Sequence, residues 1–385
     1  MNRKILFIAI REPKKDGKGD QVILYHRIEA MLENDYSVYI CILSKEGNSN
    51  WLANEFNKDV KLLSAGTFNL LSVFFSVILN FYEPLQVSMF WSKKIHDNIS
   101  KLILKNEITQ VHNILLRTSK YFFGNNQSID LIDSMTLNFR RRLINSNYFL
   151  KLLFKFELKR LEPFEKKISH LYKNSFVVSN IDNSFFEKKA SVIPVGVDIP
   201  VRKSAKKFNS VKTIIGFTGN MSYSPNIEAV NWFLDKVWSI FLNNDSKFEF
   251  RIVGRNPSSS LISKVKNYSN VKIIGEVPNI YDYIFENIDI CVAPMTSGSG
   301  MQFKVIEAMV NQAPVILSDL AVGDINIKNN KECIICDSPE SYYTSIVKLV
   351  ENESFRDKLI VKAENKVLQE YSWDSINSKY IKHYN

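Results

Sequence analysis

The segment from Asp289 to Asp319 constrains the fold of this chain more than any other part of the sequence. It begins with a short apolar run, which is typical of a buried strand, and continues into a Ser/Gly loop. Apolar periodicity over 301–311 then predicts a helix, and Pro314 ends it before a second apolar run at 315–317. Strand, glycine loop, helix and strand form a βαβ unit, which is typical of an α/β fold.

The loop of this unit has the backbone features of a phosphate site. Gly298 and Gly300 leave the main chain bare just before a predicted helix N-terminus. Free N–H groups and the positive end of a helix dipole both favour an anion at that point. We therefore predict a bound phosphate group contacted by Gly298, Ser299, Gly300, Met301 and Gln302.

Lys304 and Glu307 are three positions apart on the predicted helix, so their side chains are neighbours on the face opposite the apolar residues. A cation and a carboxylate beside a phosphate site suit a nucleotide, with Lys304 for the diphosphate and Glu307 for the ribose hydroxyls. The alternative is a surface ion pair on an ordinary helix, which the spacing alone favours.

The run Gly298-Ser-Gly-Met-Gln-Phe-Lys-Val-Ile-Glu-Ala-Met309 resembles the donor-binding core of retaining glycosyltransferases of the GT-B fold, glycosyltransferase family 4. It is most similar to a bacterial sugar transferase subgroup with the motif Gly-Ser-Gly-Met-Gln-x-Lys-x-x-Glu-Ala-Met. The wider family has two glutamates separated by seven residues; Glu307 matches the second, and Ser299 stands in place of the first. The resemblance therefore implies that backbone amides near Gly300 and Met301 help to hold the donor hexose.

The resemblance covers nearly the whole chain and is densest over 213–320. The run Phe217-Thr-Gly-Asn-Met-Ser-Tyr-Ser-Pro-Asn226 resembles the same subgroup and implies donor contacts at Gly219 and Asn220. The wider family often has basic residues here, so the cationic role falls to Lys304 and Arg255. The exit of the predicted strand at 271–277 resembles a loop that contacts the nucleobase, which implies a role for Val277.

Three regions of the first half of the chain supply further candidates. A loop with Gly17 and Gly19 follows the first predicted strand, and ligands bind at the carboxyl ends of such strands. The resemblance implies that this loop approaches the donor diphosphate; the alternative is a solvated turn.

His112 is predicted to end a strand at 108–112, with Arg117 in the following loop, and Asp133 is predicted to lie at the end of the next strand. The resemblance implies catalytic roles for His112 and Arg117 and acceptor binding by Asp133, although a lone histidine at a strand end is more often structural.

Charge suggests an anionic partner. The net charge of +10 suits a diphosphate ligand, an anionic lipid surface or nucleic acid, but no nucleic-acid-binding signature is present, so we expect no nucleic acid. The region 140–167 is rich in Lys and Arg with apolar residues interleaved, and Lys151, Lys155 and Lys159 share one helical face. This face predicts either a membrane-surface patch for a lipid-linked acceptor or an ordinary solvated surface. An apolar segment at 70–79 predicts a buried helix or one that dips into the membrane surface.

We expect a cytoplasmic protein, peripheral at the inner face of the cytoplasmic membrane if the basic region binds lipid. No signal peptide is recognisable, and no apolar run approaches the ~18 residues of a membrane span. Four cysteines agree with a reducing compartment, and Cys333 and Cys336 are expected to pack in a core. No ligand spacing for a metal is present, so neither a metal nor another cofactor is expected.

These observations predict two doubly wound, Rossmann-like domains of the GT-B fold that face each other across a cleft. We expect an acceptor domain at 1–203, a donor domain at 204–370 and a C-terminal helix at 371–385 that returns to the first domain. The resemblance implies a retaining, metal-independent glycosyltransferase that moves a sugar from a nucleotide-diphosphate sugar to a glycan or lipid-linked saccharide in bacterial surface polysaccharide synthesis, as of O-antigen lipopolysaccharide or capsule. The alternatives are a nucleotide-sugar epimerase, a catalytically inactive nucleotide-binding or assembly protein, and a lipid-surface scaffold.

Overall fold

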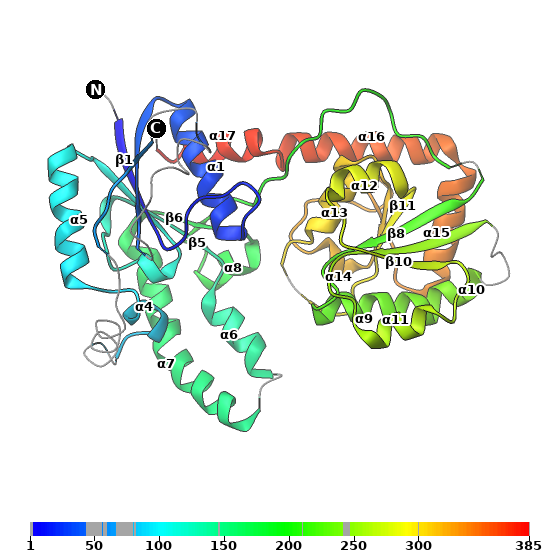
Figure 1. Cartoon of the computed structure of the whole chain (residues 1–385), viewed down its shortest axis with the longest axis horizontal. Helices are drawn as coiled ribbons and strands as arrows, with labels where there is room; N and C mark the ends of the chain where they lie inside the picture. Colours follow the sequence, from blue (N-terminus) through cyan, green and yellow to red (C-terminus); the bar gives the residue numbers. More distant parts are fainter. Residues whose placement is uncertain are drawn as a thin grey trace. The chain divides into compact units, whose positions relative to one another are not determined.

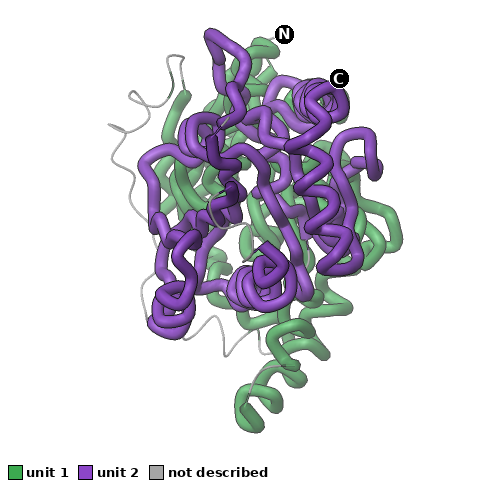
Figure 2. Tube along the Cα trace, turned by 90° about the vertical axis from the view of Figure 1, so that its right-hand side faces the viewer, with its two compact units in different colours: residues 1–195, 376–385 green, residues 196–375 purple. Residues whose placement is uncertain are grey.

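The computed structural model describes residues 3–43, 56, 60–66, 80, 82–144, 147–209, 211–241, 247–298 and 300–384. The chain divides into two compact units (Figures 1 and 2). Unit 1 consists of Met1–Val195 with Ile376–Asn385, and unit 2 of Gly196–Ser375. Each unit contains one parallel sheet with helices packed on it, as predicted for two Rossmann-like domains.

The sheet of unit 1 has the strand order β3-β2-β1-β4-β5-β6-β7. Its strands are β1 (Arg3–Ala9), β2 (Tyr36–Ile42), β3 (Val60–Leu62), β4 (Gln110–Ile114), β5 (Gly124–Ile132), β6 (Tyr172–Val177) and β7 (Ser191–Val192). β1 is buried from Ile5 to Ala9, because helices cover both faces of a parallel sheet. The direction of chain progression reverses between β1 and β4, and ligands bind at the carboxyl ends of strands at such a switch point.

The helices of unit 1 are α1 (Gly19–Glu33), α4 (Leu85–Ser88), α5 (Lys93–Asn106), η1 (Leu116–Thr118), α6 (Met135–Ile144), α7 (Tyr148–Leu171) and α8 (Asn180–Phe185). α1 begins earlier than the apolar pattern predicts, because Gln21 accepts a hydrogen bond from the Lys18 amide (3.2 Å) and caps the first turn. None of the described helices is both long and apolar enough to cross a bilayer. The helix predicted at 70–79 lies outside the described residues.

The sheet of unit 2 has the order β10-β9-β8-β11-β12-β13, which reverses between β8 and β11. Its strands are β8 (Thr213–Thr218), β9 (Phe248–Val253), β10 (Val271–Gly275), β11 (Ile290–Ala293), β12 (Val315–Leu317) and β13 (Ile334–Ile335). Its helices are α9 (Ser224–Trp232), η2 (Phe233–Trp238), α10 (Ser239–Phe241), α11 (Ser259–Val265), α12 (Ile280–Asn287), α13 (Phe303–Val310), α14 (Asp319–Val322), α15 (Pro339–Glu351) and α16 (Glu353–Glu370). Cys291, Cys333 and Cys336 are buried free thiols in its core, as expected for packing residues.

The last helix, α17 (Trp373–Ile381), leads the chain from unit 2 back into unit 1, which confirms the predicted return. Gly196 lies under the start of this helix, where a Cβ atom would come within 2.5 Å of the Trp373 ring. At the other end, Tyr384 is buried in unit 1 and its carbonyl accepts a hydrogen bond from the Tyr36 hydroxyl (3.3 Å). The C-terminal segment is therefore part of the core of unit 1.

The segment at 200–209 is fastened to unit 2 by side chains. Arg202 donates to Asp282 and to Asn311, both at 2.7 Å. The buried Asp289 carboxylate accepts from the backbone amides of Asn209 (3.0 Å) and Ile214 (2.7 Å). Side chains far along the sequence thus satisfy polar groups of this segment, which no local sequence pattern records.

Candidate functional site

The loop between β11 and α13 lies at the switch point of the unit 2 sheet. Gly298 (φ +108°) and Gly300 (φ +81°) both adopt backbone conformations that favour glycine. A Cβ atom on Gly298 would also press on Pro225 of α9 at 3.3 Å. Among the described residues, no side chain caps α13, whose N-cap is Gln302, and a bound phosphate at this helix start stays a prediction. Ser299 lies outside the described residues.

Lys304, in the first turn of α13, is half-buried and turned toward α9 and the end of β8. Its Nζ donates to Asn226 Oδ1 at 2.5 Å, lies 3.5 Å from Met295 Sδ and sits 4.5 Å from the centre of the Phe217 ring. Burial among these groups lowers the pKa of Lys304 to about 8. The surface ion pair with Glu307 is not formed, because the ammonium group pairs with Asn226 instead.

Glu307, one turn further along α13, is also half-buried. Burial raises its pKa to about 7, against the opposing effect of the Lys304 charge. Tyr281 and Cys291 lie near it, and the Glu307 charge contributes to the raised pKa of both groups. Within the described part of the chain, no side chain donates a hydrogen bond to the Glu307 carboxylate. Such a carboxylate can accept hydrogen bonds from the hydroxyls of a ligand.

Two glycine turns bring the ends of β8 and β9 into backbone contact beside this loop. Gly254 has φ +147°, and a Cβ atom there would lie 1.8 Å from the Gly219 carbonyl oxygen. Gly219 (φ +155°) in turn faces Asn226, whose Nδ2 would lie 2.7 Å from a Cβ atom. These glycines leave the main chain accessible at the carboxyl ends of both strands.

The remaining candidates of unit 2 differ in what their side chains do. The Asn220 side chain is engaged in its own turn, where Oδ1 accepts from the Ser222 amide (3.1 Å) and hydroxyl (2.9 Å). Arg255 is exposed and, among the described residues, its side chain has no hydrogen-bond or ion-pair partner. Val277 is half-buried and packs against the core. Donor contacts by these residues stay predictions. Because the Asn220 side chain is already hydrogen-bonded, Asn220 would contact the donor through its backbone.

Residues of α9 complete the site and were not predicted from the sequence. Asn226 holds Lys304 and donates through Nδ2 to the Asn220 carbonyl (3.0 Å). Glu228 accepts from the hydroxyls of Ser224 (2.7 Å) and of Ser297 in the glycine loop, and these bonds lower its pKa. The sequence signal for Asn226 is its position in the Ser-Pro-Asn run at the start of α9. Helix periodicity alone identifies it only as a residue of the first turn.

In unit 1, side chains from three adjacent strand ends meet around a cavity of about 220 Å³. Its lining includes Arg11 after β1, Arg117 after β4 and Asp133 after β5, together with Asn138 and Arg142 of α6. The structure thus brings Arg117 and Asp133 together at the switch point of the sheet, and it adds Arg11, which sequence reasoning missed.

The backbone beside this cavity is strained. Leu115 (φ +71°) follows β4, and Ile132 (φ +69°) ends β5. A positive φ is uncommon for any residue with a side chain and is a genuine outlier for a β-branched one. Strained backbone of this kind clusters at functional sites, where the surrounding fold holds it in place. The two strained residues immediately precede the segments that carry Arg117 and Asp133.

We predicted that His112 ends a strand. It lies instead in the middle of β4 and is 0% exposed. Its Nδ1 contacts the hydroxyls of Tyr384 and, at 3.1 Å, of Tyr380. Its Nε2 lies 3.4 Å from Asp130, which also accepts from Arg27 (3.1 Å). Burial lowers the pKa of His112. The prediction of a position facing the acceptor is therefore corrected: the imidazole is a packing residue for the C-terminal segment, which sequence spacing could not reveal.

The other two glycines predicted as site residues lie at the start of α1. The Gly17 amide donates to the Lys14 carbonyl (3.2 Å), and a Cβ atom on Gly17 would lie 2.8 Å from Cβ of Gln21. Gly19 is the first residue of α1 and has open space around it. Gly17 therefore closes a tight turn, and contact of this loop with a donor stays a prediction.

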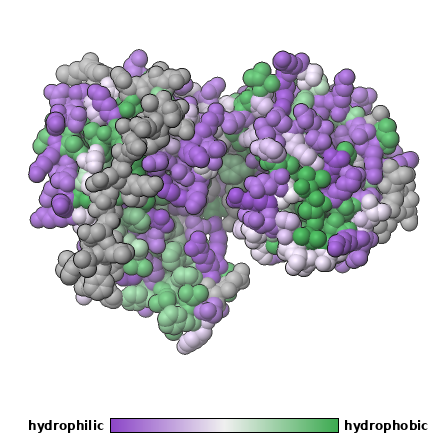
Figure 3. Space-filling model, viewed as in Figure 1, coloured by the Kyte–Doolittle hydropathy of each residue, from purple (hydrophilic) through white to green (hydrophobic). Residues whose placement is uncertain are grey.

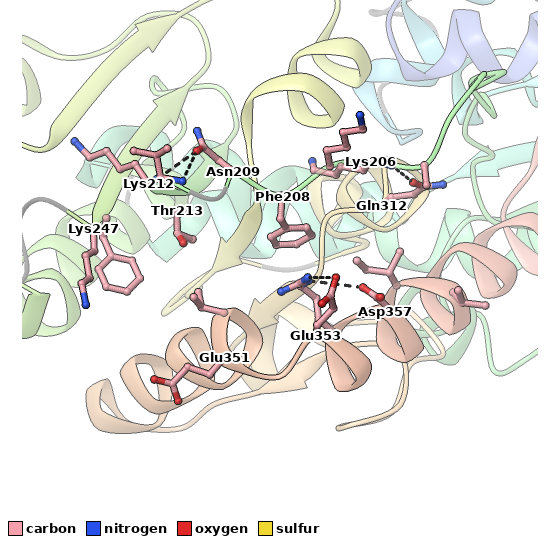
Figure 4. Close-up of a pocket in the computed structure, with 18 of the residues that line it drawn as sticks. Lys206, Phe208, Asn209, Lys212, Thr213, Lys247, Gln312, Glu351, Glu353 and Asp357 are labelled. Atoms are coloured by element: carbon pink, nitrogen blue, oxygen red, sulfur yellow. Dashed lines mark hydrogen bonds and ion pairs between the residues drawn. The ribbon is translucent and has the colours of Figure 1, made fainter.

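A larger cavity of about 1020 Å³ lies at the amino ends of β8 and β9, away from the glycine loop (Figure 4). It is lined by residues 205–209 and 211–213 on one side and by residues of α15 and α16 on the other. In its wall, Arg356 lies 3.6 Å from Glu353 and 3.7 Å from Asp357, and its guanidinium stacks on Phe208 at 4.0 Å. The stacking of Arg356 on Phe208 holds this part of the 205–209 segment against α16.

Comparison with known proteins adds to this geometry. Residues 212–352 match the family of group 1 glycosyl transferases. That range runs from the start of β8 to the end of α15 and includes Lys304, Glu307 and the glycine loop. Over its length the chain is 20% identical to an uncharacterized 44.6 kDa protein in the cps region of Klebsiella pneumoniae, covering 98% of this chain and 99% of the relative.

Solved structures share the fold over nearly all of the chain. Sucrose-phosphate synthase from Thermosynechococcus elongatus has a TM-score of 0.64 at 13% identity, covering 99% of this chain and 98% of that one. WaaG, a glycosyltransferase involved in lipopolysaccharide biosynthesis, has a TM-score of 0.62 at 10% identity, covering 98% and 99%. Anabaena HepE in complex with UDP-glucose has a TM-score of 0.58 at 12% identity, covering 98% of each chain. The fold is GT-B, as predicted.

Proposed function

We propose that this protein transfers a sugar from a nucleotide-diphosphate sugar to a saccharide acceptor, with retention at the anomeric carbon. The observation that carries the proposal is the pair Lys304 and Glu307, half-buried and unpaired with each other, directly after the Gly298–Gly300 loop. The pair lies in the range that matches group 1 glycosyl transferases, and the fold recurs in HepE, which is solved with UDP-glucose. We assign the site to the donor nucleotide.

In this proposal the donor diphosphate binds at the start of α13. The first-turn amides contact its oxygens, and the Lys304 ammonium turns from Asn226 to the added negative charge. Glu307 accepts hydrogen bonds from the ribose hydroxyls. The bond between the anomeric carbon and the diphosphate oxygen breaks, a new bond to the acceptor oxygen forms on the same face, and the leaving diphosphate takes the acceptor proton. One such charge-stabilising donor contributes about 3 kcal/mol, or ~10²-fold in rate.

Positive charge at the diphosphate comes from Lys304 and the start of α13, so we propose that the transfer needs no metal ion. Within the described part of the chain, no group of three His, Cys, Asp or Glu side chains could hold a metal ion. Transfer that continues undiminished in EDTA is the expected result. A strict requirement for manganese would contradict this part of the proposal.

We further propose a lipid-linked acceptor in surface polysaccharide synthesis, at the inner face of the cytoplasmic membrane. A relative from a cps region and the lipopolysaccharide enzyme WaaG are the comparisons that favour this setting. The α6–α7 hairpin of unit 1 exposes Ile144, Tyr148, Phe149, Leu152, Leu153 and Phe156, of which Tyr148 is 79% and Phe149 69% exposed. Figure 3 shows a green, hydrophobic surface over the end of this hairpin. Basic side chains interleave with them, as in helices that bind anionic membranes.

The proposal is tested by a panel of nucleotide-diphosphate sugars, first by thermal shift and then by transfer to lipid-linked and soluble saccharides. We expect one donor nucleotide to raise the melting temperature and to support transfer with retained anomeric configuration. A donor that is epimerised in the absence of acceptor would favour the epimerase alternative. Nucleotide binding without transfer to any acceptor would favour an inactive binding protein.

Affinity for a nucleotide-diphosphate sugar should depend on pH in a bell shape. Glu307, with a pKa of about 7, gains its carboxylate charge as pH rises through that value, so affinity increases. Lys304, with a pKa of about 8, loses its ammonium charge above that value, so affinity falls again. Tyr281 and Cys291 have raised pKa values, about 12 for Cys291, and stay neutral throughout.

Titration calorimetry with UDP-glucose between about pH 6 and about pH 9 measures this profile, because its diphosphate diester does not titrate in that range. Lys304→Met should remove the alkaline fall and keep the acid rise. An affinity that stays constant over the range would contradict the assignment of both residues.

A further inference from the structure

The cavity of unit 1 has a chemistry that is not explained by the fold alone. Arg11, Arg117 and Arg142 line it, and Asp133 is the one carboxylate among the described residues of its lining. It lies where β1, β4 and β5 end, at the switch point of the sheet. A small cavity with an excess of cations at this position calls for an anionic ligand group.

Arg117 is the informative residue. It is half-buried, and its guanidinium lies 5.6 Å from the centre of the Phe90 ring. Within the described part of the chain, no carboxylate forms a hydrogen bond or ion pair with it. Burial and the nearby Arg11 charge lower its pKa, against the opposing effect of the Asp20 carboxylate. A cation withdrawn from water next to a like charge costs free energy unless an anion binds beside it.

Arg11 cannot relieve this repulsion by turning away. Its Nε donates to Asp20 at 2.9 Å, and a second nitrogen lies 2.6 Å from the other oxygen of the same carboxylate. Asp20 is buried in the first turn of α1, so the two bonds fix the guanidinium at the end of β1. Arg11 is thus held beside Arg117 as an ion pair with Asp20, which leaves Arg117 as the guanidinium without a carboxylate partner among the described residues.

The rest of the lining suits a sugar. The Asp133 carboxylate is aligned by the Asn138 amide (2.8 Å) and can accept bonds from hydroxyls. Leu115, Leu116 and Phe139 supply apolar surface for the face of a sugar ring. The strained Leu115 and Ile132 fix the backbone on which this lining depends.

We propose that this cavity binds the acidic group of the acceptor, through Arg117 beside Arg11, so that the acceptor is an anionic saccharide. The inference rests on the proposed glycosyl transfer and specifies its acceptor. The acidic group has two possible sources with the same chemistry, a uronate carboxylate within a glycan or the diphosphate of a lipid-linked saccharide. Arg117 suits either, because a guanidinium bonds carboxylate and phosphate oxygens in pairs.

The test compares binding of methyl glucuronide, farnesyl diphosphate and neutral methyl glucoside, by ligand-observed NMR titration with the donor site saturated by UDP. We expect at least one of the two anions to bind about tenfold or more tightly than the glucoside, since a bond to a charged group is worth that much. Arg117→Gln should abolish the preference, and Arg117→Lys should keep part of it. Preference for the glucuronide identifies a uronate acceptor, and preference for farnesyl diphosphate identifies a lipid diphosphate.

Arg3→Gln is the matched control, because it removes the same charge from the exposed start of β1, at the opposite edge of the sheet. It should bind all three probes as the wild type does. Equal binding of the anions and the glucoside by the wild type, or an unchanged preference in Arg117→Gln, would overturn the inference. UDP binding, measured separately, checks the fold of each variant. A wild type that fails to bind any nucleotide would contradict the proposed function while leaving the comparison of the probes readable.

Discussion

Replacing Lys304 by methionine should lower the turnover of sugar transfer by about 10²-fold or more, while the protein keeps its fold. The methionine side chain fills a similar volume but supplies no charge to the departing diphosphate. Stability should change little, because the substitution has two opposing effects. It removes a hydrogen bond to Asn226, and it also removes the cost of burying an ammonium group, a burial that lowers the pKa of Lys304 to about 8. The measurements are kcat with saturating donor and the melting temperature without ligand.

Lys264→Met on α11 provides the control. That lysine is bonded to Asp235 at 2.7 Å and belongs to the same unit, but it lies outside the glycine-loop site. Its replacement should leave kcat unchanged. A Lys304→Met protein that transfers sugar at the wild-type rate would refute the assigned role, and one that is unfolded would be replaced in the test by Lys304→Gln.

The second large effect is expected at the α6–α7 hairpin. Changing Phe149, Leu153 and Phe156 together to serine should weaken binding to anionic vesicles by about 10³-fold, because each apolar side chain withdrawn from water contributes about 1.5 kcal/mol or more. These residues are 69%, 48% and 45% exposed, so their replacement removes little packing within the protein. Co-sedimentation with vesicles that contain phosphatidylglycerol measures the loss.

Two comparisons make the vesicle result specific. Leu104 on α5 and Ile181 on α8 are exposed apolar residues outside the hairpin, and Leu104→Ser with Ile181→Ser should bind vesicles like the wild type. Vesicles of neutral phosphatidylcholine should bind the wild type weakly, since the basic residues then find no partner. Undiminished binding by the hairpin variant would show that another surface meets the membrane.

The sequence predicts unit 2 well because its information there is local. The apolar run, the two glycines and the helix period lie within 31 consecutive residues, 289–319, and they predict β11, α13 and β12 within about two residues. The partner of Lys304 lies 78 residues away on α9, and no periodicity links Asn226 to it. Local patterns therefore identify the elements of the site but not the contacts between them.

The errors in unit 1 have the same physical origin. We expected His112 at a strand end, but β4 continues to Ile114 and the C-terminal segment, 272 residues away, covers the imidazole. Sequence reasoning did not identify Arg11 as a site residue, and its pairing with Asp20 shows that its guanidinium is fixed at the end of β1. Burial decides the roles of both residues, and burial is a property of the assembled fold.

The placement of Tyr380 and Tyr384 in unit 1 also bears on how this protein is made. A ribosome completes the strands of that unit long before it reaches these tyrosines. While unit 2 is synthesised, the tyrosines therefore do not yet pack against Arg27, Asp130 and His112. Unit 1 can reach its final packing only after residues 376–384 have been made, whereas unit 2 is continuous in sequence and can fold as it emerges.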